Sequence, residues 1–247
     1  MSMDLILLAA GLFLVIATLY SSIGHAGASG YLAVMALLSF PTDSIKPISL
    51  VLNIVVAGIA AFRFIRAGYF DLRVFLSFAV ASLPMAYIAG AMKLDAHYFK
   101  LGAGVFLILS GVVMLLKGYL QPATEEKRRM PLLAALPIGA VVGWISGLIG
   151  VGGGIFLSPI LILARWTSVK EAGGVSALFI LVNSISGLLG NRASLSLLDG
   201  SMAWWVAAVV VGGLVGSYLG TKRYGNRVIL GCLFLVLVSA GIKFLVA

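Results

Sequence analysis

Residues 149–159 read Ile-Gly-Val-Gly-Gly-Gly-Ile-Phe-Leu-Ser-Pro, a glycine cluster that ends one long apolar segment and begins a short one. A fainter copy, Ile-Gly-His-Ala-Gly-Ala-Ser-Gly-Tyr, occupies residues 23–31, about half a chain earlier. Because glycine has no side chain, backbone N–H groups in such clusters can approach a small ligand closely. Two clusters at matching places in two apolar halves predict a duplicated chain with a binding site where the copies meet.

The composition indicates an integral membrane protein. Hydrophobic residues make up 62% of the 247 residues and charged residues only 10%, and the mean hydropathy is +1.15. A soluble domain carries roughly 25% charged residues, so this chain has too few to cover a surface in water. Apolar stretches of about 18 residues or more recur along it, and each is a candidate transmembrane helix.

The net charge of +9 does not indicate a nucleic-acid partner. The 17 Lys and Arg residues lie mostly between apolar segments, where such residues set the orientation of a membrane protein. The single cysteine, Cys232, cannot form an internal disulfide, and we expect it to be a small core residue. Residues 1–23 have no basic leader, so we expect a retained first segment rather than a signal peptide.

Ten apolar segments divide the chain, and eight are long enough to cross about 30 Å of hydrocarbon as helices. They are 5–23, 31–40, 48–66, 72–92, 98–117, 132–149, 155–164, 172–190, 203–220 and 228–246. The second and seventh are too short for a full crossing unless the flanking glycines contribute. Their matching positions favour either broken helices or re-entrant hairpins. We expect ten segments with the two short ones partial or tilted, and the hairpin alternative stays open.

The two halves align as copies of each other. Ile23-Gly24 matches Ile149-Gly150, Lys46 matches Lys170, and Asn53 falls near Asn183. We therefore predict an all-α polytopic membrane protein of two inverted-topology repeats, each with about five helical segments and a Gly-rich break after the first. Residues 1–117 form the first repeat, 118–131 a cytoplasmic linker, and 132–247 the second repeat.

The basic residues predict the orientation. Loops 63–73, 117–131, 165–171 and 220–228 hold twelve of the 17 Lys and Arg residues, and we place these loops in the cytoplasm. The other side keeps Lys46, Lys93, Lys100, Arg192 and Lys243. This bias requires an odd number of segments in each repeat, so the second copy is inverted and both termini lie outside.

The second glycine cluster predicts an anion site. Each glycine inside a helix costs about 1 kcal/mol relative to alanine, so the helix breaks here. The helix that resumes at Ile155 presents unpaired N–H groups and the positive end of its dipole, which suit an anion. The alternative is close helix packing through small residues. No βαβ unit surrounds these glycines, which excludes a dinucleotide fingerprint.

Three polar side chains join the glycines as candidates. His25 can bind an anion or carry a coupling proton, unless it is an interfacial histidine bonded to backbone. Asn53 and Asn183 lie inside apolar segments, where each contacts either the ligand or a neighbouring helix. The candidate substrate-binding residues are Gly24, His25, Ala26, Gly27, Ser29, Asn53, Gly150, Gly152, Gly153, Gly154 and Asn183.

The acidic residues argue against a cationic substrate. All eight lie in termini, loops or segment edges, whereas carriers of protons or sodium usually place acids in the membrane interior. Backbone dipoles with a histidine suit a small anion instead. Two histidines without interior acids are also a poor basis for a membrane-embedded enzyme, and we expect no metal site and no cofactor.

The glycine cluster Gly150-Val151-Gly152-Gly153-Gly154 followed by Pro159, with its fainter first copy, resembles the TauE/SafE family of sulfite exporters and related permeases. The resemblance covers essentially the whole chain, although His25 and Ala26 stand where glycine-rich sequence is usual. It implies transport of a sulfur oxyanion, an organosulfonate or a carboxylate across the bacterial cytoplasmic membrane.

We therefore expect a secondary transporter of a small anion, by the family's commonest label an exporter, that works by alternating access around a midplane site. A passive anion channel of the same architecture is the alternative. The expected partners are the anion and the lipid bilayer, with a homo-oligomer as a candidate assembly.

Overall fold

A computed structural model describes residues 2–117, 128, 130–198, 200–222 and 227–246. Most of the predicted linker 118–131 and the side chain of Cys232 lie outside this part. The described chain is helical without strands, which confirms the predicted all-α class. The helices are α1 (Met3–Ser21), α2 (Ala28–Leu37), α3 (Thr42–Arg66), α4 (Leu72–Ala91), α5 (Ala96–Lys117), α6 (Leu132–Ile149), α7 (Gly154–Leu163), α8 (Val169–Gly190), α9 (Met202–Lys222) and α10 (Arg227–Val246), with a short 3₁₀ helix η1 (Arg192–Leu197) that the sequence did not predict.

Local sequence sets several helix starts. Asp71 accepts a hydrogen bond from the backbone N–H of Val74 and so begins α4. Ser168 and Glu171 form a reciprocal capping box at the start of α8. Such caps satisfy backbone donors that have no partner within the helix. The polar residues between apolar runs therefore define where the helices begin.

Seven helices in the described chain are long and apolar enough to span a membrane, namely α1, α3, α4, α5, α6, α8 and α9. The helices α2 and α7 have 10 residues each, a rise of about 15 Å. This is half of the roughly 30 Å hydrocarbon core, so neither can cross it alone.

Contacts show that the short helices fold back. The helix α2 returns toward the end of the molecule where α1 begins, and α7 returns toward the end where α6 begins. Trp205, at the start of α9, donates to the carbonyl of Ile6 in the first turns of α1 and packs its ring on Phe40, just after α2. In the second half, the N–H of Arg128, before α6, donates to the carbonyl of Arg165, after α7, at 2.8 Å. The pairs α1–α2 and α6–α7 are therefore hairpins that turn at the glycine clusters, which is the alternative that the sequence left open.

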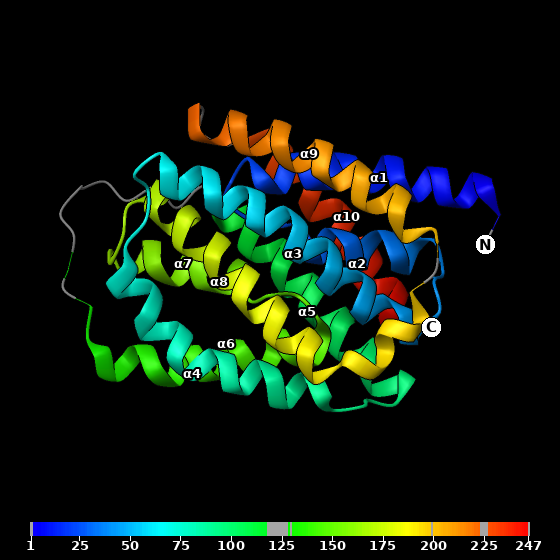
Figure 1. Cartoon of the computed structure of the whole chain (residues 1–247), viewed down its shortest axis with the longest axis horizontal. Coiled ribbons are helices and arrows are strands. Elements are labelled where there is room, and N and C mark those ends of the chain that lie inside the picture. Colours follow the sequence, from blue (N-terminus) through cyan, green and yellow to red (C-terminus); the bar gives the residue numbers. More distant parts are fainter. Residues whose placement is uncertain (1, 118–127, 129, 199, 223–226, 247) are drawn as a thin grey trace.

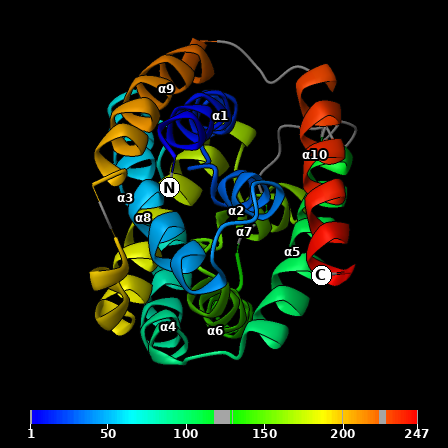
Figure 2. The ribbon, with the colours of Figure 1, turned by 90° about the vertical axis from the view of Figure 1, so that its right-hand side faces the viewer.

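The helices pair across the two halves. α1 packs on α9, α4 on α6, α3 on α8, and α5 on α10; Figure 1 shows the long helices roughly parallel to one axis. If each of α1 to α5 is exchanged with its counterpart among α6 to α10, the pair α1–α9 becomes α6–α4. The pairs α3–α8 and α5–α10 stay the same. We interpret this as the two-fold relation of the predicted repeats. Figure 2, a view from one end, shows α2 and α7 in the middle with the long helices around them.

The loops predicted to be cytoplasmic meet at one end of the molecule. Besides the bond between Arg128 and Arg165, Lys170 donates to the Tyr69 hydroxyl at 3.0 Å. Arg63, near the end of α3, lies over the ring of Tyr218 in the last turns of α9. The grouping agrees with the charge count, and the orientation in a membrane remains a prediction.

Glycines let two of the pairs approach closely. On α6, Gly139, Gly143 and Gly147 face the backbone of α4, and on α9, Gly212, Gly216 and Gly220 face the backbone of α1. A Cβ on Gly216 would collide with the carbonyl of Thr18 and the hydroxyl of Ser21. Small residues allow this backbone contact between helices in a membrane, and they attach one long arm of each hairpin to a helix of the other half.

We expect Gly216→Ala to lower the free energy of unfolding by about 1–3 kcal/mol, because the added methyl must push α1 and α9 apart. Thermal unfolding of the detergent-solubilised protein measures this change. Gly11→Ala is the matched control, since Gly11 is exposed on α1 with no atom within 4 Å of its added Cβ. Equal melting temperatures for the two variants would contradict the close contact.

Candidate functional site

The first glycine cluster is held tightly by its surroundings. Gly24 and Gly27 have positive φ angles of 76° and 101°, which favour glycine. The Tyr31 hydroxyl donates to the carbonyl of Ala26 at 2.7 Å, and the Tyr20 hydroxyl and the Ser29 hydroxyl lie 2.9 Å apart. Among the predicted site residues, Ala26 and Ser29 therefore have partners within the protein.

His25 connects this cluster to the second half of the chain. The side chain is buried, its Nδ1 lies 3.1 Å from the carbonyl oxygen of Ile23, and its Nε2 lies 3.3 Å from the Ser158 hydroxyl. Ser158 in turn lies 2.7 Å from the Ser176 hydroxyl of α8. A carbonyl only accepts, so in the neutral ring Nδ1 carries the proton and Nε2 accepts from Ser158.

This chain of hydrogen bonds joins the first cluster to α7 and α8. Ser158 lies four residues from Gly154, about 6 Å along the helix. Protonation of His25 would make Nε2 a donor, and Ser158 would then have to donate to Ser176 instead. The histidine therefore lies inside the protein, not at its surface, and its protonation state sets the direction of the hydrogen bonds.

The second cluster turns the chain between α6 and α7. Gly150, Gly152 and Gly153 have positive φ angles of 86°, 73° and 76°. No side chain caps the start of α7, so its first N–H groups point into the interior without a side-chain acceptor. All five residues from Gly150 to Gly154 are buried. The backbone here offers the donors and the positive helix end that the sequence predicted.

Buried polar atoms without partners gather around this second cluster. Asn53 is fully buried, and neither its amide oxygen nor its amide nitrogen has a hydrogen-bond partner in the described chain. It lies one helical turn beyond Ser49, whose hydroxyl donates to the carbonyl of Gly150 at 2.9 Å. Leaving a buried polar group unpaired costs about 1–3 kcal/mol, so the amide of Asn53 is available to a ligand.

Two serines complete this group. The Ser184 hydroxyl on α8 lies 3.0 Å from the position that a Cβ on Gly152 would occupy. The backbone carbonyl of Ser146, in the last turn of α6, accepts from the N–H groups of Gly150 and Val151. Both hydroxyls are buried and unpaired within the described residues. The same is true of Ser110 and Thr167, which lie on α5 and between α7 and α8.

Asn183 differs from Asn53, although the sequence treats them as counterparts. Its amide oxygen accepts from the Ser82 hydroxyl of α4 at 2.5 Å, and its amide nitrogen donates to the carbonyl of Phe179 at 2.8 Å. Asn183 therefore ties α8 to α4, which is the interhelical alternative. The structure places Asn53 on α3 one turn beyond Ser49, which contacts the second cluster, and gives Asn183 partners of its own.

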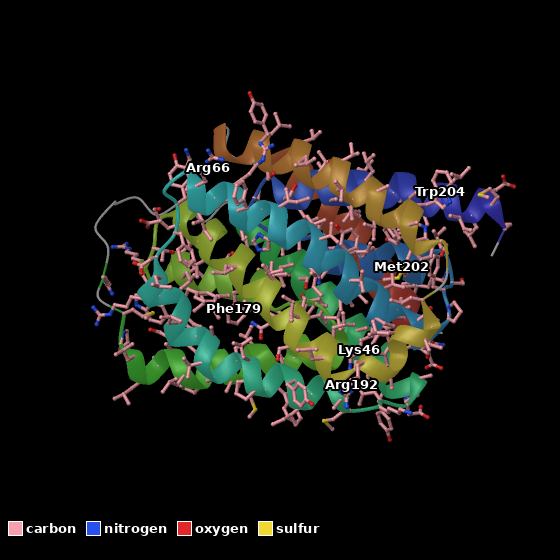
Figure 3. The ribbon with its side chains drawn as sticks, viewed as in Figure 1. Lys46, Arg66, Phe179, Arg192, Met202 and Trp204 are labelled. Carbon is pink, nitrogen blue, oxygen red and sulfur yellow. The ribbon has the colours of Figure 1, made fainter. Side chains whose placement is uncertain are left out.

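Lys46 belongs to this region and was absent from the predicted site. The sequence counted it among loop cations, whereas the structure places it in the second turn of α3, only 8% exposed. In the sequence Lys46 stands between Ser44-Ile45 and Pro47, which has the composition of a loop, so no local signal marked it as buried. Figure 3 shows Lys46 toward the same end of the molecule as Arg192, with Arg66 at the opposite end.

The described residues contain no group of three or more His, Cys, Asp or Glu side chains that could hold a metal ion. The second cluster offers main-chain donors and lies beside the hydroxyl of Ser184 and the stem of Lys46, whose ammonium rests on the carbonyls of Gly90 and Ala89.

Comparisons with known proteins agree with a membrane transporter. The family model described as "Sulfite exporter TauE/SafE" matches residues 7–244. The chain is 34% identical over 235 residues to "Probable membrane transporter protein y4hK" of Sinorhizobium fredii, which covers 94% of this chain and 95% of that protein. It is 29% identical over 106 residues to a "Probable membrane transporter protein" of Xylella fastidiosa, 40% of this chain and 38% of that one. No solved structure matches.

The two asparagines should respond oppositely to substitution. Without added anion, we expect Asn53→Leu to raise the free energy of unfolding by about 1–3 kcal/mol, because it removes an unpaired buried amide. The matched variant Asn183→Leu should lower it by a similar amount, since it leaves Ser82 without its partner. Thermal unfolding in detergent compares them. A loss of stability in both would mean that Asn53 has partners within the protein.

Proposed function

This chain belongs to the sulfite exporter TauE/SafE family, and we propose that it is a secondary transporter that carries a small anion by alternating access. That it is a membrane transporter rather than an enzyme follows from the family and from the curated relatives. The finer parts of the proposal are the anion, a sulfur oxyanion such as sulfite, an organosulfonate or a related organic acid, and the direction, which by the family's description is export.

The observation that carries the proposal is the set of unsatisfied polar groups around the second glycine cluster. The hydroxyl of Ser184 and the uncapped start of α7 lie at the cluster, and the buried amide of Asn53 lies one turn of α3 beyond Ser49, which bonds to Gly150. Oxygen atoms of a small anion would accept from each of these donors. The first cluster, with its internal hydrogen bonds, supports the site through His25.

Alternating access would use the two hairpins as moving parts. The hairpin α1–α2 is fixed to α9, and the hairpin α6–α7 is fixed to α4, by the glycine contacts between their backbones. The bond between His25 and Ser158 joins the two hairpins. Rocking of the whole repeats 1–117 and 132–247 against each other would separate these fixed pairs. We therefore propose that α1, α2 and α9 move as one unit relative to α4, α6 and α7, which would expose the anion to each side of the bacterial cytoplasmic membrane in turn.

The alternative function is a passive anion channel of the same architecture. A carrier binds its solute on one side before it releases it on the other, and it therefore shows saturable counterflow. Two short helices that begin inside the protein favour a carrier, because they are natural gates on either side of a central site.

Proteoliposomes test the anion and the carrier mechanism together. Uptake of sulfite, sulfate, thiosulfate, taurine, sulfoacetate and lactate is measured with unlabelled anion inside the vesicles. We expect saturable counterflow of at least one of them, and a loss of about tenfold or more in Asn53→Leu, because the anion loses an amide donor. Gly11→Ala serves as the control with unchanged flux. Single-channel currents in place of counterflow would contradict the carrier.

The same vesicles test proton coupling through His25. An imposed pH gradient should stimulate wild-type flux, because protonation reverses the hydrogen bonds from His25 to Ser176. The variant His25→Gln can still bond to Ser158 but cannot change its charge. We expect it to keep counterflow and to lose the effect of the gradient. Equal stimulation in both proteins would remove His25 from the coupling.

A further inference from the structure

Lys46 is a buried cation with only partial charges as partners. Its ammonium donates to the carbonyl of Gly90 at 2.9 Å and reaches that of Ala89 at 3.5 Å. These carbonyls end α4, where the helix dipole is negative. No carboxylate among the described residues pairs with this ammonium, although a buried charge normally requires a full counter-charge. The positive charge is therefore only partly compensated.

The stem of Lys46 lies against the second glycine cluster. A Cβ on Gly150 would lie 3.1 Å from Cγ of Lys46. Ser49 and Asn53 follow at helical spacings of three and four residues, so the three side chains share one face of α3. The side chains of Lys46, Ser49 and Asn53 thus follow one another along α3, beginning beside the cluster. They supply an ammonium, a hydroxyl that already bonds to Gly150, and an amide without a partner in the described chain.

Resting on the proposed function, we propose that Lys46 is the mobile counter-charge of the transported anion. When an anion occupies the second cluster, the ammonium leaves the carbonyls of Gly90 and Ala89 and pairs with it, while the stem stays against Gly150. The lysine stem is flexible enough for this change, and its three donors rotate freely. Hydrogen bonds between two charged partners are roughly twice as strong as those between neutral groups, so the anion is the better partner.

The proposal gives the site its selectivity. A single buried ammonium matches one negative charge and discriminates against neutral analogues, which would leave the cation as poorly compensated as before. Lys170, which the sequence aligns with Lys46, does not lie beside a glycine cluster in the same way. Lys170 donates to the Tyr69 hydroxyl and lies over its ring, at the end of the molecule where α8 begins. The counter-charge therefore belongs to the second cluster alone.

The test compares anion affinity in three purified variants reconstituted into vesicles. Sulfite is the first probe and lactate, which carries a single negative charge, is the second, and the half-saturating concentration of counterflow is the readout. Lys46→Gln removes the charge and should raise that concentration by about tenfold or more. Lys46→Arg keeps the charge and should stay close to wild type. Lys46→Met removes the charge but keeps an apolar stem, and it replaces Lys46→Gln where that variant is too unstable to purify.

Lys243→Gln is the matched control for a purely structural role. Lys243 donates to the carbonyl of Leu37 at the end of α2 and to the Ser39 hydroxyl, both at 2.9 Å. It thus bonds to a helix end as Lys46 does, but without contact with the glycine cluster. We expect it to lower the melting temperature without changing the half-saturating concentration. Added sulfite should raise the melting temperature of wild type and of this control, and not that of Lys46→Gln.

The outcomes separate the two proposals. Equal half-saturating concentrations in wild type and Lys46→Gln would overturn the role of Lys46 and leave the anion carrier intact. The absence of saturable flux of any panel anion in the wild type would overturn the carrier itself, and the role of Lys46 with it. A loss of affinity in Lys243→Gln equal to that in Lys46→Gln would assign both lysines to structure.

Discussion

The architecture depends on one constraint: two helices are interrupted inside an apolar protein, and each interruption releases backbone donors and acceptors that hydrocarbon cannot satisfy. Both interruptions are therefore buried and enclosed by other helices. The carbonyl of Ala26 accepts from Tyr31, and that of Gly150 accepts from Ser49. The long helices around α2 and α7 exclude lipid from these segments, and the close pairs α1–α9 and α4–α6 hold the hairpins in position.

The two interruptions differ in how far the protein satisfies them. At the first, tyrosine hydroxyls and the chain from His25 to Ser176 occupy the polar groups. At the second, Asn53 and Ser184 keep atoms that have no partner in the described chain, whereas the lack of a side-chain cap is common to α2 and α7. Natural proteins retain such unfavourable groups mainly where function requires them. Under the proposed function, the first cluster would hold the two hairpins together and the second would bind the anion.

Much of the fold could be predicted because membrane helices leave a strong local signal. The ten apolar segments match the ten helices to within a few residues, except at the start of α3, which begins at Thr42 rather than at residue 48. That difference hid Lys46, since a lysine followed by Pro47 has the composition of a loop. Of the candidate site, the glycines and His25 were predictable by type, whereas the roles of Asn53 and Asn183 were indistinguishable because their neighbours come from distant helices.

The sequence by itself determined that this is an all-helical membrane protein with two helix breaks, because apolar length and glycine content act locally along the chain. Only the tertiary structure decided that the short helices return to the end where their partners began, since Trp205 and Arg165 lie far along the chain from the residues they contact. It also decided which asparagine is satisfied and where the Lys46 ammonium rests. Hydrogen bonds and burial depend on neighbours from the other half, and a single segment carries no information about them.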